Sequence, residues 1–181
     1  DYVIDGGVSG ILLFGSNGEF YVVEEDEMER GLKIVVDQAA GRVPVYFGIG
    51  AISTKKCVRL AKMAVANGAA SVSVLQPMFL KPTETELFTH FKAIADAIPE
   101  TPVLLYNNPG RVGYTLSANL VERLAHEVPN IVGMKDTSGD ITQTSEVIRR
   151  RYSAARIPCC TLLCATAQLV VYVPQQTLCR S

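Results

Sequence analysis

The chain has 181 residues, of which 48% are hydrophobic and 19% are charged, an ordinary composition for one soluble domain. Its formal net charge of −1 gives no electrostatic reason to expect a nucleic acid or an anionic membrane as partner. No apolar run approaches the roughly 20 residues of a membrane-spanning helix, and the chain does not open on a signal-peptide pattern.

The composition changes near residue 150. Residues 1–146 carry all 18 acidic residues. Residues 147–181 carry five arginines and no acidic residue. We therefore interpret residues 1–150 as a partial catalytic domain and residues 151–181 as an atypical tail. A frameshifted or non-native origin is one interpretation of this tail, and a remodelled tail that serves binding is the other. The first part has a single cysteine, Cys57, which is compatible with a reducing cytoplasm. The tail cysteines form no CxxC pair and have no histidine or acid nearby, so we expect no metal site.

Short apolar runs alternate with segments of helical period through the first 150 residues. The runs are mostly apolar on both faces, as buried parallel strands are; they cover residues 10–14, 43–47, 70–75, 102–106 and 131–135. Helical segments cover residues 24–39, 54–67, 83–97 and 117–127, and a last helix begins near residue 140. This alternation predicts an α/β fold with a parallel sheet covered by helices.

Two architectures are compatible with such a repeat. A doubly wound sheet binds its ligand at one crevice, whereas a closed (β/α)8 barrel places functional residues at the carboxyl ends of many strands. Polar or special residues follow nearly every predicted strand here, which favours the barrel. A whole barrel takes about 250 residues, and only five or six strands are readable, so we expect an incomplete one.

Lys135 and Tyr106 end two successive predicted strands, so a barrel would make them neighbours. A lysine at the mouth of a barrel lies in a low dielectric, and a neutral amine is the form that attacks a carbonyl to give an imine. A phenol beside a forming imine can relay protons. Taken alone, a lysine that extends from the strand end to water is the simpler interpretation of Lys135, and Tyr106 could be structural.

Two loops could bind carboxylates. The turn Gly15–Glu19 allows close backbone approach, so the amides of Ser16 and Asn17 could hold a carboxylate while the Ser16 hydroxyl joins a proton relay. Arg111, on the loop after Tyr106, has a guanidinium suited to a second carboxylate. An ordinary turn and a solvated arginine are the simpler alternatives.

Three motifs resemble one known family, that of dihydrodipicolinate synthase and N-acetylneuraminate lyase, which are Schiff-base lyases on a TIM barrel. Gly15–Glu19 resembles the family's G-[ST]-x-G-E, residues 106–109 its YNxP, and residues 133–136 its G-[IM]-K-[DE]. The resemblance runs from about residue 1 to residue 150. It implies Lys135 as the imine lysine, Tyr106 as the proton-relay phenol, and Ser16 with Asn17 as the cradle of the 2-oxo acid carboxylate.

The resemblance implies a pyruvate-dependent lyase or synthase that uses no cofactor beyond the covalent imine on Lys135. Arg111 resembles the arginine with which the synthases hold aspartate semialdehyde, so 4-hydroxy-tetrahydrodipicolinate synthase of lysine biosynthesis is the first interpretation. Phe79 lacks the hydroxyl of the tyrosine that a neighbouring subunit supplies in the synthases. A 4-hydroxy-2-oxoglutarate or N-acetylneuraminate-type aldolase is therefore the alternative. The family also implies a homo-oligomer, a tetramer in the complete enzyme.

A third hypothesis is that the chain is an inactive truncated barrel. The resemblance implies one strand and helix before residue 1 and two βα units after residue 150. We expect the tail to supply one substitute strand, from residues 162–163 or 169–173, and not the full missing set. Open strand edges would then lead to association.

Overall fold

The computed structural model describes residues 1–154, 161–165 and 168–172. Its centre is a sheet with the strand order β1-β2-β3-β4-β5-β7-β6, in which β1 to β5 are parallel in chain order. The parallel strands are β1 (Ile11–Leu13), β2 (Val45–Ile49), β3 (Ser71–Leu75), β4 (Val103–Asn107) and β5 (Ile131–Asp136). Strands β3, β4 and β5 are buried throughout, as their uninterrupted apolar runs predict.

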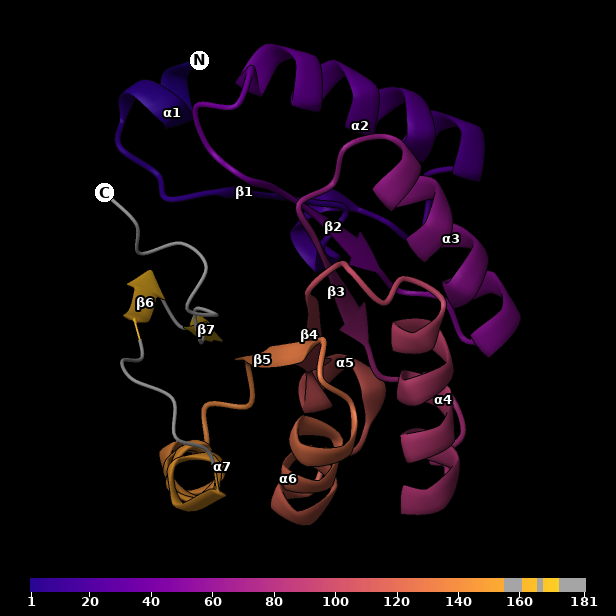
Figure 1. Cartoon of the computed structure of the whole chain (residues 1–181), viewed down its shortest axis with the longest axis vertical. Helices are drawn as coiled ribbons and strands as arrows, with labels where there is room; N and C mark the ends of the chain where they lie inside the picture. The colour runs from indigo at the N-terminus through magenta and orange to yellow at the C-terminus, as the bar shows by residue number, and fades with distance from the viewer. Residues whose placement is uncertain (155–160, 166–167, 173–181) are drawn as a thin grey trace.

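The helices lie outside the strands. They are α1 (Tyr2–Asp5), α2 (Glu25–Ala39), α3 (Thr54–Ala66), α4 (Glu84–Asp96), α5 (Pro109–Val112), α6 (Ala118–Glu127) and α7 (Ile141–Ala154), with a 3-10 turn η1 (Ser16–Gly18). Figure 1 shows α2, α3, α4, α6 and α7 in an arc around the strands, each next to its chain neighbour. This is the layering of consecutive βα units.

The helix starts follow from their capping residues. Thr83 and Glu86 form the predicted capping box of α4: the Thr83 amide donates to the Glu86 carboxylate at 2.7 Å, and the Glu86 amide donates to the Thr83 hydroxyl at 3.3 Å. Ser53 and Ser117 accept from the backbone at the starts of α3 and α6. The caps fix where each helix begins and hence which face it buries.

The core lies between the sheet and the arc of helices. Among its largest fully buried apolar side chains are Phe47 of β2 and Leu105 of β4. Facing helices contribute Leu32 of α2, Phe91 and Ile94 of α4, and Leu124 of α6. Because Phe47 and Leu105 point to the helix-covered outer face of the sheet, the alternate residues of their strands point to the inner face. The site described below is built on that inner face.

The structure differs from the predicted elements in three places. Strand β2 ends at Ile49 rather than at residue 47, and the short elements α5 and η1 were not predicted. The tail supplies two strands, β6 (Thr161–Ala165) and β7 (Gln168–Tyr172), where one was expected. They form an antiparallel pair, and β7 runs antiparallel to β5, with Leu169 opposite Asp136.

The proposed boundary at residue 150 falls inside α7, and the prediction of two domains remains a prediction. The expectation of no metal on the tail cysteines concerns side chains outside the described residues. Among the helices that the structure describes, none is long and apolar enough to cross a membrane.

Candidate active site

Lys135 and Tyr106 lie side by side on the inner face of the sheet. They are register partners on the parallel strands β5 and β4, and each has only 5% of its surface exposed. The Lys135 Nζ lies 4.2 Å from the centroid of the Tyr106 ring, a cation–π distance. Within the described part of the chain, Lys135 has no carboxylate at ion-pair distance. A buried amine without a counter-charge, beside a phenol, suits attack on a carbonyl.

Hydrogen-bonding groups from separate segments converge on the Tyr106 hydroxyl. The Ser16 Oγ, from η1, lies 3.4 Å from the Tyr106 Oη, and the Asn108 side-chain amide donates to the same oxygen at 2.8 Å. Ser16 is half-buried, so it lies between the phenol and the solvent. The structure therefore brings together Lys135, Tyr106 and Ser16 from segments 90 and 29 residues apart.

The pKa of Tyr106 is lowered from its ordinary value. Burial opposes ionisation of the phenol, but hydrogen bonds from Ser16, Thr137 and Asn108 and the positive charge of Lys135 outweigh that effect. A phenol with a lowered pKa exchanges its proton more readily near neutral pH than an isolated tyrosine does. The environment thus suits Tyr106 for proton transfer.

The turn after β1 places backbone amides at the same end of the sheet. Ser16 and Asn17 are the first two residues of η1, and amides at the start of a helical turn have no partner within it. Asn17 is exposed, so a carboxylate can reach its amide from solvent. The role of these two amides as a cradle for a carboxylate stays a prediction.

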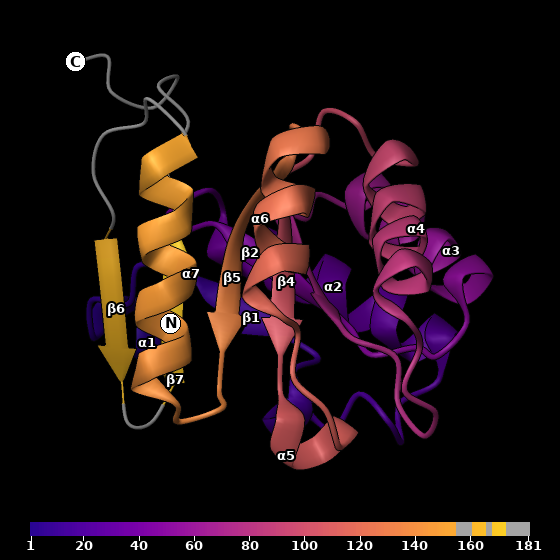
Figure 2. The same cartoon turned by 90° about the horizontal axis from the view of Figure 1, so that it is seen from below.

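Arg111 lies on α5, which follows β4 directly. Figure 2 shows α5 beyond the carboxyl ends of β4 and β5. The Arg111 side chain is exposed and makes no ion pair or hydrogen bond with any residue that the structure describes. It is therefore free to bind an anion at the rim, but no contact joins it to Tyr106 or Lys135.

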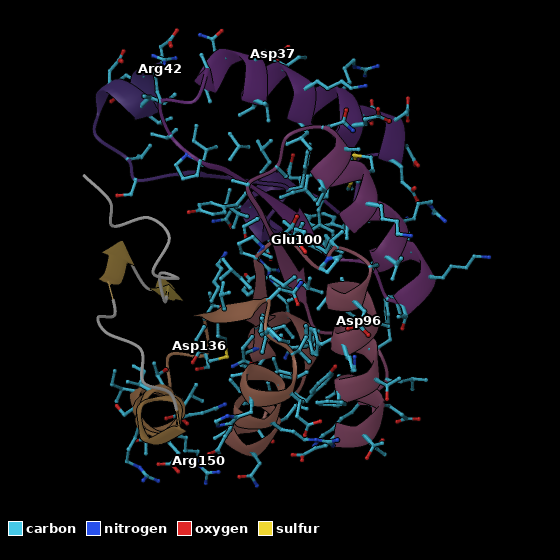
Figure 3. All side chains as sticks on the ribbon, viewed as in Figure 1. Asp37, Arg42, Asp96, Glu100, Asp136 and Arg150 are labelled. Carbon is cyan, nitrogen blue, oxygen red and sulfur yellow. The ribbon has the colours of Figure 1, made fainter. Side chains whose placement is uncertain are left out.

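A buried polar network behind the site was not predicted. The Asp136 carboxylate accepts from the Asn107 amide at 2.9 Å, from the Ser138 backbone at 2.9 Å and from the Thr144 hydroxyl at 2.8 Å. Figure 3 labels Asp136 at the end of β5 on the side of α7, where Thr144 lies. The Gln76 amide extends the network by donating to the Asn107 oxygen at 3.2 Å. These bonds join the ends of β3, β4 and β5 and fix the strands that carry Tyr106 and Lys135.

The sequence signal for this network was the polar residue at each strand end. Gln76, Asn107 and Asp136 follow apolar runs, but their sequence positions do not show that all three are buried and bonded to one another. His90, interpreted from the sequence as structural, is buried on α4 and its Nδ1 lies 2.8 Å from the Thr54 hydroxyl. No cluster of three potential metal ligands occurs among the described residues.

A small cavity adjoins Tyr106 on the inner face. Its volume is about 10 Å³, and its wall is almost entirely apolar, although Ser16, Ser73 and Tyr106 are among the residues that line it. Gly48 and Gly50 form part of its wall, and a side chain at either position would clash with neighbouring atoms. A Cβ at Gly48 would lie 2.5 Å from the Phe14 carbonyl oxygen, and one at Gly50 would lie 2.1 Å from the Phe20 ring.

The chain matches the family described as the dihydrodipicolinate synthetase family over residues 1–159, and it belongs to that family. It is 42% identical over 147 residues to the 4-hydroxy-tetrahydrodipicolinate synthase of Sorangium cellulosum, covering 81% of this chain and 48% of that protein. The synthase of Dechloromonas aromatica is also 42% identical, over 150 residues, with 83% and 51% covered. The chain thus spans about half the length of the curated relatives that it matches.

Solved structures of the same family resemble the fold of this chain. Dihydrodipicolinate synthase of Acinetobacter baumannii, complexed with pyruvate, has 37% identity and a TM-score of 0.81, over 84% of this chain and 52% of that one. YagE of Escherichia coli K12, a prophage protein of the same family also solved with pyruvate, has 32% identity and a TM-score of 0.81, over 85% and 51%. The prediction of a partial (β/α)8 barrel is confirmed: β1 to β5 and their helices correspond to about half of such a barrel.

Proposed function

We propose that this chain carries the Schiff-base centre of a pyruvate-dependent lyase. The observation that carries the proposal is the buried Lys135 amine, 4.2 Å from the ring of Tyr106 and without a carboxylate partner in the described residues. Membership of a family with pyruvate complexes among its structures supports pyruvate as the 2-oxo acid. The covalent link forms to the protein's own lysine, so the proposal includes no cofactor.

The proposed reaction begins when the Lys135 nitrogen adds to the keto carbon of pyruvate and a proton passes from nitrogen to the carbonyl oxygen. The resulting carbinolamine loses its hydroxyl group as water, with a proton from Tyr106, and leaves a protonated imine on Lys135. Ser16 exchanges the proton of Tyr106 with solvent, because it lies 3.4 Å from the phenol and is half-exposed. The amides of Ser16 and Asn17 hold the pyruvate carboxylate.

For the second substrate we propose aspartate semialdehyde, which makes the reaction that of a 4-hydroxy-tetrahydrodipicolinate synthase. Arg111 is exposed at the rim and makes no ion pair with any residue that the structure describes. It is suited to this carboxylate, since a guanidinium binds a carboxylate through two parallel hydrogen bonds. The names of the matched relatives support this substrate.

One observation favours a 2-oxo acid aldolase as the second candidate. Phe79 is 86% exposed and has a φ of 73°, so the chain presents a phenyl ring there that cannot relay protons. An aldolase acting on 4-hydroxy-2-oxoglutarate or an N-acetylneuraminate-type substrate would cleave a carbon–carbon bond from the same imine. Turnover of pyruvate with aspartate semialdehyde, compared with cleavage of 4-hydroxy-2-oxoglutarate, distinguishes the two.

The imine itself is tested by trapping. Incubation with pyruvate and borohydride should add one reduced adduct to Lys135, located by peptide mass spectrometry, because hydride reduces the protonated imine to a stable amine. Lys135→Ala should abolish the adduct, and Lys62→Ala, which changes an exposed lysine on α3, should not. An adduct at another lysine would overturn the assignment. A folded chain that forms no adduct would support the third hypothesis, a barrel without activity.

A further inference from the structure

Gln76 is a buried amide to which the proposed reaction gives no part. It follows β3 directly and has 1% of its surface exposed, yet both of its side-chain polar atoms have partners. Its Nε2 donates to the Tyr114 carbonyl at 2.8 Å and to the Asn107 side-chain oxygen at 3.2 Å. Its Oε1 accepts from the Asn108 backbone amide at 3.1 Å. These three bonds fix the orientation of the Gln76 amide group, because its oxygen and its nitrogen cannot exchange roles.

The backbone of Gln76 also contacts the strand that carries Tyr106. Its amide donates to the Tyr106 carbonyl at 3.3 Å and so continues the pairing of β3 with β4, in which Leu75 is the register partner of Tyr106. Gln76 therefore bonds to three consecutive residues, from Tyr106 to Asn108. One residue of the neighbouring strand thus holds the whole segment that presents the phenol.

Asn108 is the N-cap residue of α5, but its side chain does not cap that helix. An asparagine at this position ordinarily accepts a hydrogen bond from the backbone amide two or three residues later. The Asn108 side chain donates instead to the Tyr106 hydroxyl, at 2.8 Å. Its backbone differs accordingly, with a ψ of 74°. The residues that do cap α3, α4 and α6 have ψ values of 136°, 161° and 150°; they are Ser53, Thr83 and Ser117.

We propose that Gln76 is a positioning residue that directs the Asn108 side-chain amide to the Tyr106 hydroxyl. Because the Gln76 Oε1 accepts from the Asn108 backbone amide, it holds Asn108 in the conformation from which its side chain reaches the phenol. Without that acceptor, Asn108 can turn to the ordinary capping conformation, and the phenol loses a donor. This inference rests on the proposed function, in which the Tyr106 hydroxyl gives a proton to the carbinolamine.

The first test is Gln76→Met, which removes all three side-chain bonds and keeps a side chain of similar length. Imine formation should slow about fivefold, the effect of losing one ordinary hydrogen bond to the phenol. The pKa of Tyr106 should rise towards its ordinary value, since the Asn108 amide favours the ionised phenol. Borohydride trapping with pyruvate measures the rate. Carbon-13 NMR of labelled tyrosine rings, assigned with Tyr106→Phe, measures the pKa.

Gln143→Met is the matched control. The Gln143 side-chain amide donates to the Leu116 carbonyl at 2.7 Å and makes no contact with the segment from Tyr106 to Asn108. Its loss should change neither the trapping rate nor the pKa of Tyr106. An equal effect of the two variants would show that any lost amide bond weakens the site, and would overturn the specific role of Gln76.

A double variant distinguishes action through Asn108 from an independent effect. If Gln76 acts through Asn108, Gln76→Met combined with Asn108→Ala should trap pyruvate at the rate of Asn108→Ala alone. Independent effects would multiply to a loss of about 25-fold. A double variant that is much slower than Asn108→Ala therefore overturns the proposal.

Gln76→Glu provides a second variant in case Gln76→Met does not fold. It keeps an oxygen that accepts from the Asn108 backbone amide. Its buried carboxyl group favours the protonated form and can then donate to the Tyr114 carbonyl, as the amide of Gln76 does. Gln76→Glu should trap pyruvate at the rate of the parent chain. Trapping as slow as that of Asn108→Ala would overturn the proposal.

The NMR measurement separates this inference from the proposed function, because it requires no imine. A parent chain that forms no adduct contradicts the proposed function alone, and the pKa of Tyr106 still decides the role of Gln76. A rise of that pKa in Gln76→Met, absent from Gln143→Met, supports the positioning role. An unchanged pKa in Gln76→Met overturns it.

Discussion

The side-chain amide of Asn108 donates a 2.8 Å hydrogen bond to the hydroxyl of Tyr106, two residues earlier in the chain. The backbone amide of Asn108 donates at 3.1 Å to the Gln76 side chain. Asn108 thus joins the phenol of the site to the buried network that holds the strand ends together. The orientation of the Tyr106 hydroxyl is therefore set from the protein side as well as from Ser16.

Asn108→Ala should reduce the rate of imine formation about fivefold, because one ordinary hydrogen bond to the phenol oxygen is lost. The pKa of Tyr106 should rise, since the lost donor stabilised the ionised form. Borohydride trapping with pyruvate measures the rate. Asn67→Ala is the matched control, because that amide donates to the Met63 carbonyl at 2.8 Å, at the end of α3. Equal rates in both variants would contradict this role.

Asp136→Asn should lower the free energy of unfolding by about 2 kcal/mol, the cost of leaving buried hydrogen-bonding groups unsatisfied. The carboxylate accepts from three donors, and an amide nitrogen in place of one oxygen cannot accept. Urea unfolding measures the change. Asp96→Asn removes an exposed pair with Lys92 and should cost less than about 1 kcal/mol. Similar costs for the two variants would show that the network contributes little.

The stability of the chain should fall as the pH decreases from about 6.5 to 4. Burial lowers the pKa of His90 to about 4, so the unfolded chain binds this proton at a higher pH than the folded chain does. The effect should reach about 3 kcal/mol and should be absent above pH 6.5. Lys81 and Glu86 border the same hollow as His90, so the comparison must keep both.

The measurement is the free energy of unfolding of the parent and of His90→Gln across that pH range. The variant should show the shallower pH dependence. His126→Gln, which changes an exposed histidine on α6, controls for the substitution itself. If the parent and His90→Gln show parallel pH dependences, His90 does not cause the loss.

Strand β1 should mediate association. It stands at one end of the sheet and pairs only with β2 among the described strands, and Leu12 on it is exposed. An exposed apolar edge strand pairs readily with other chains. Leu12→Lys should therefore reduce concentration-dependent association in sedimentation velocity. Ile34→Lys, on the exposed face of α2, should not. A parent chain that sediments as a single monomeric species would show that β1 does not mediate association.

A second contact surface should form at Phe79 and Leu80. These adjacent side chains are 86% and 82% exposed, which is unusual for two large apolar residues in sequence. Replacement of both by serine should shift a sedimenting oligomer towards smaller species, because apolar area would no longer be buried. Ile141→Ser removes another exposed apolar side chain, at the start of α7, and serves as the control. Retention of the full oligomer would exclude this surface.

Most of the fold could be predicted because its signals are local. Apolar runs gave the parallel strands, and Ser53, Thr83 and Ser117 marked three helix starts that the structure confirms. The end of β2 was placed too early because Gly48 and Gly50 read as a turn. They are glycines for another reason, since Phe14 and Phe20 press against them from distant segments. The antiparallel direction of β7 has no local signal.

The site could be predicted in part. Tyr106 and Lys135 lie at the ends of neighbouring parallel strands. Their proximity could be predicted because the βα repeat implies that successive strands pair in parallel. The role of Asn108 could not be read in the same way, because its bond to the Tyr106 hydroxyl depends on how the backbone turns after β4. A hydroxyl in an apolar strand also gives no indication of its partner: the Ser71 hydroxyl donates to the carbonyl of Pro102, 31 residues away.

Consecutive residues of β5 serve opposite layers of the protein. Lys135 faces Tyr106 on the inner side, and Asp136 faces Thr144 of α7 on the outer side. Deletion of one residue within β5 would exchange these directions, presenting a carboxylate to the reacting carbon and an amine to the helices. Changes of chain length compatible with catalysis are therefore confined to the loops, and a library for directed evolution should keep β5 free of gaps.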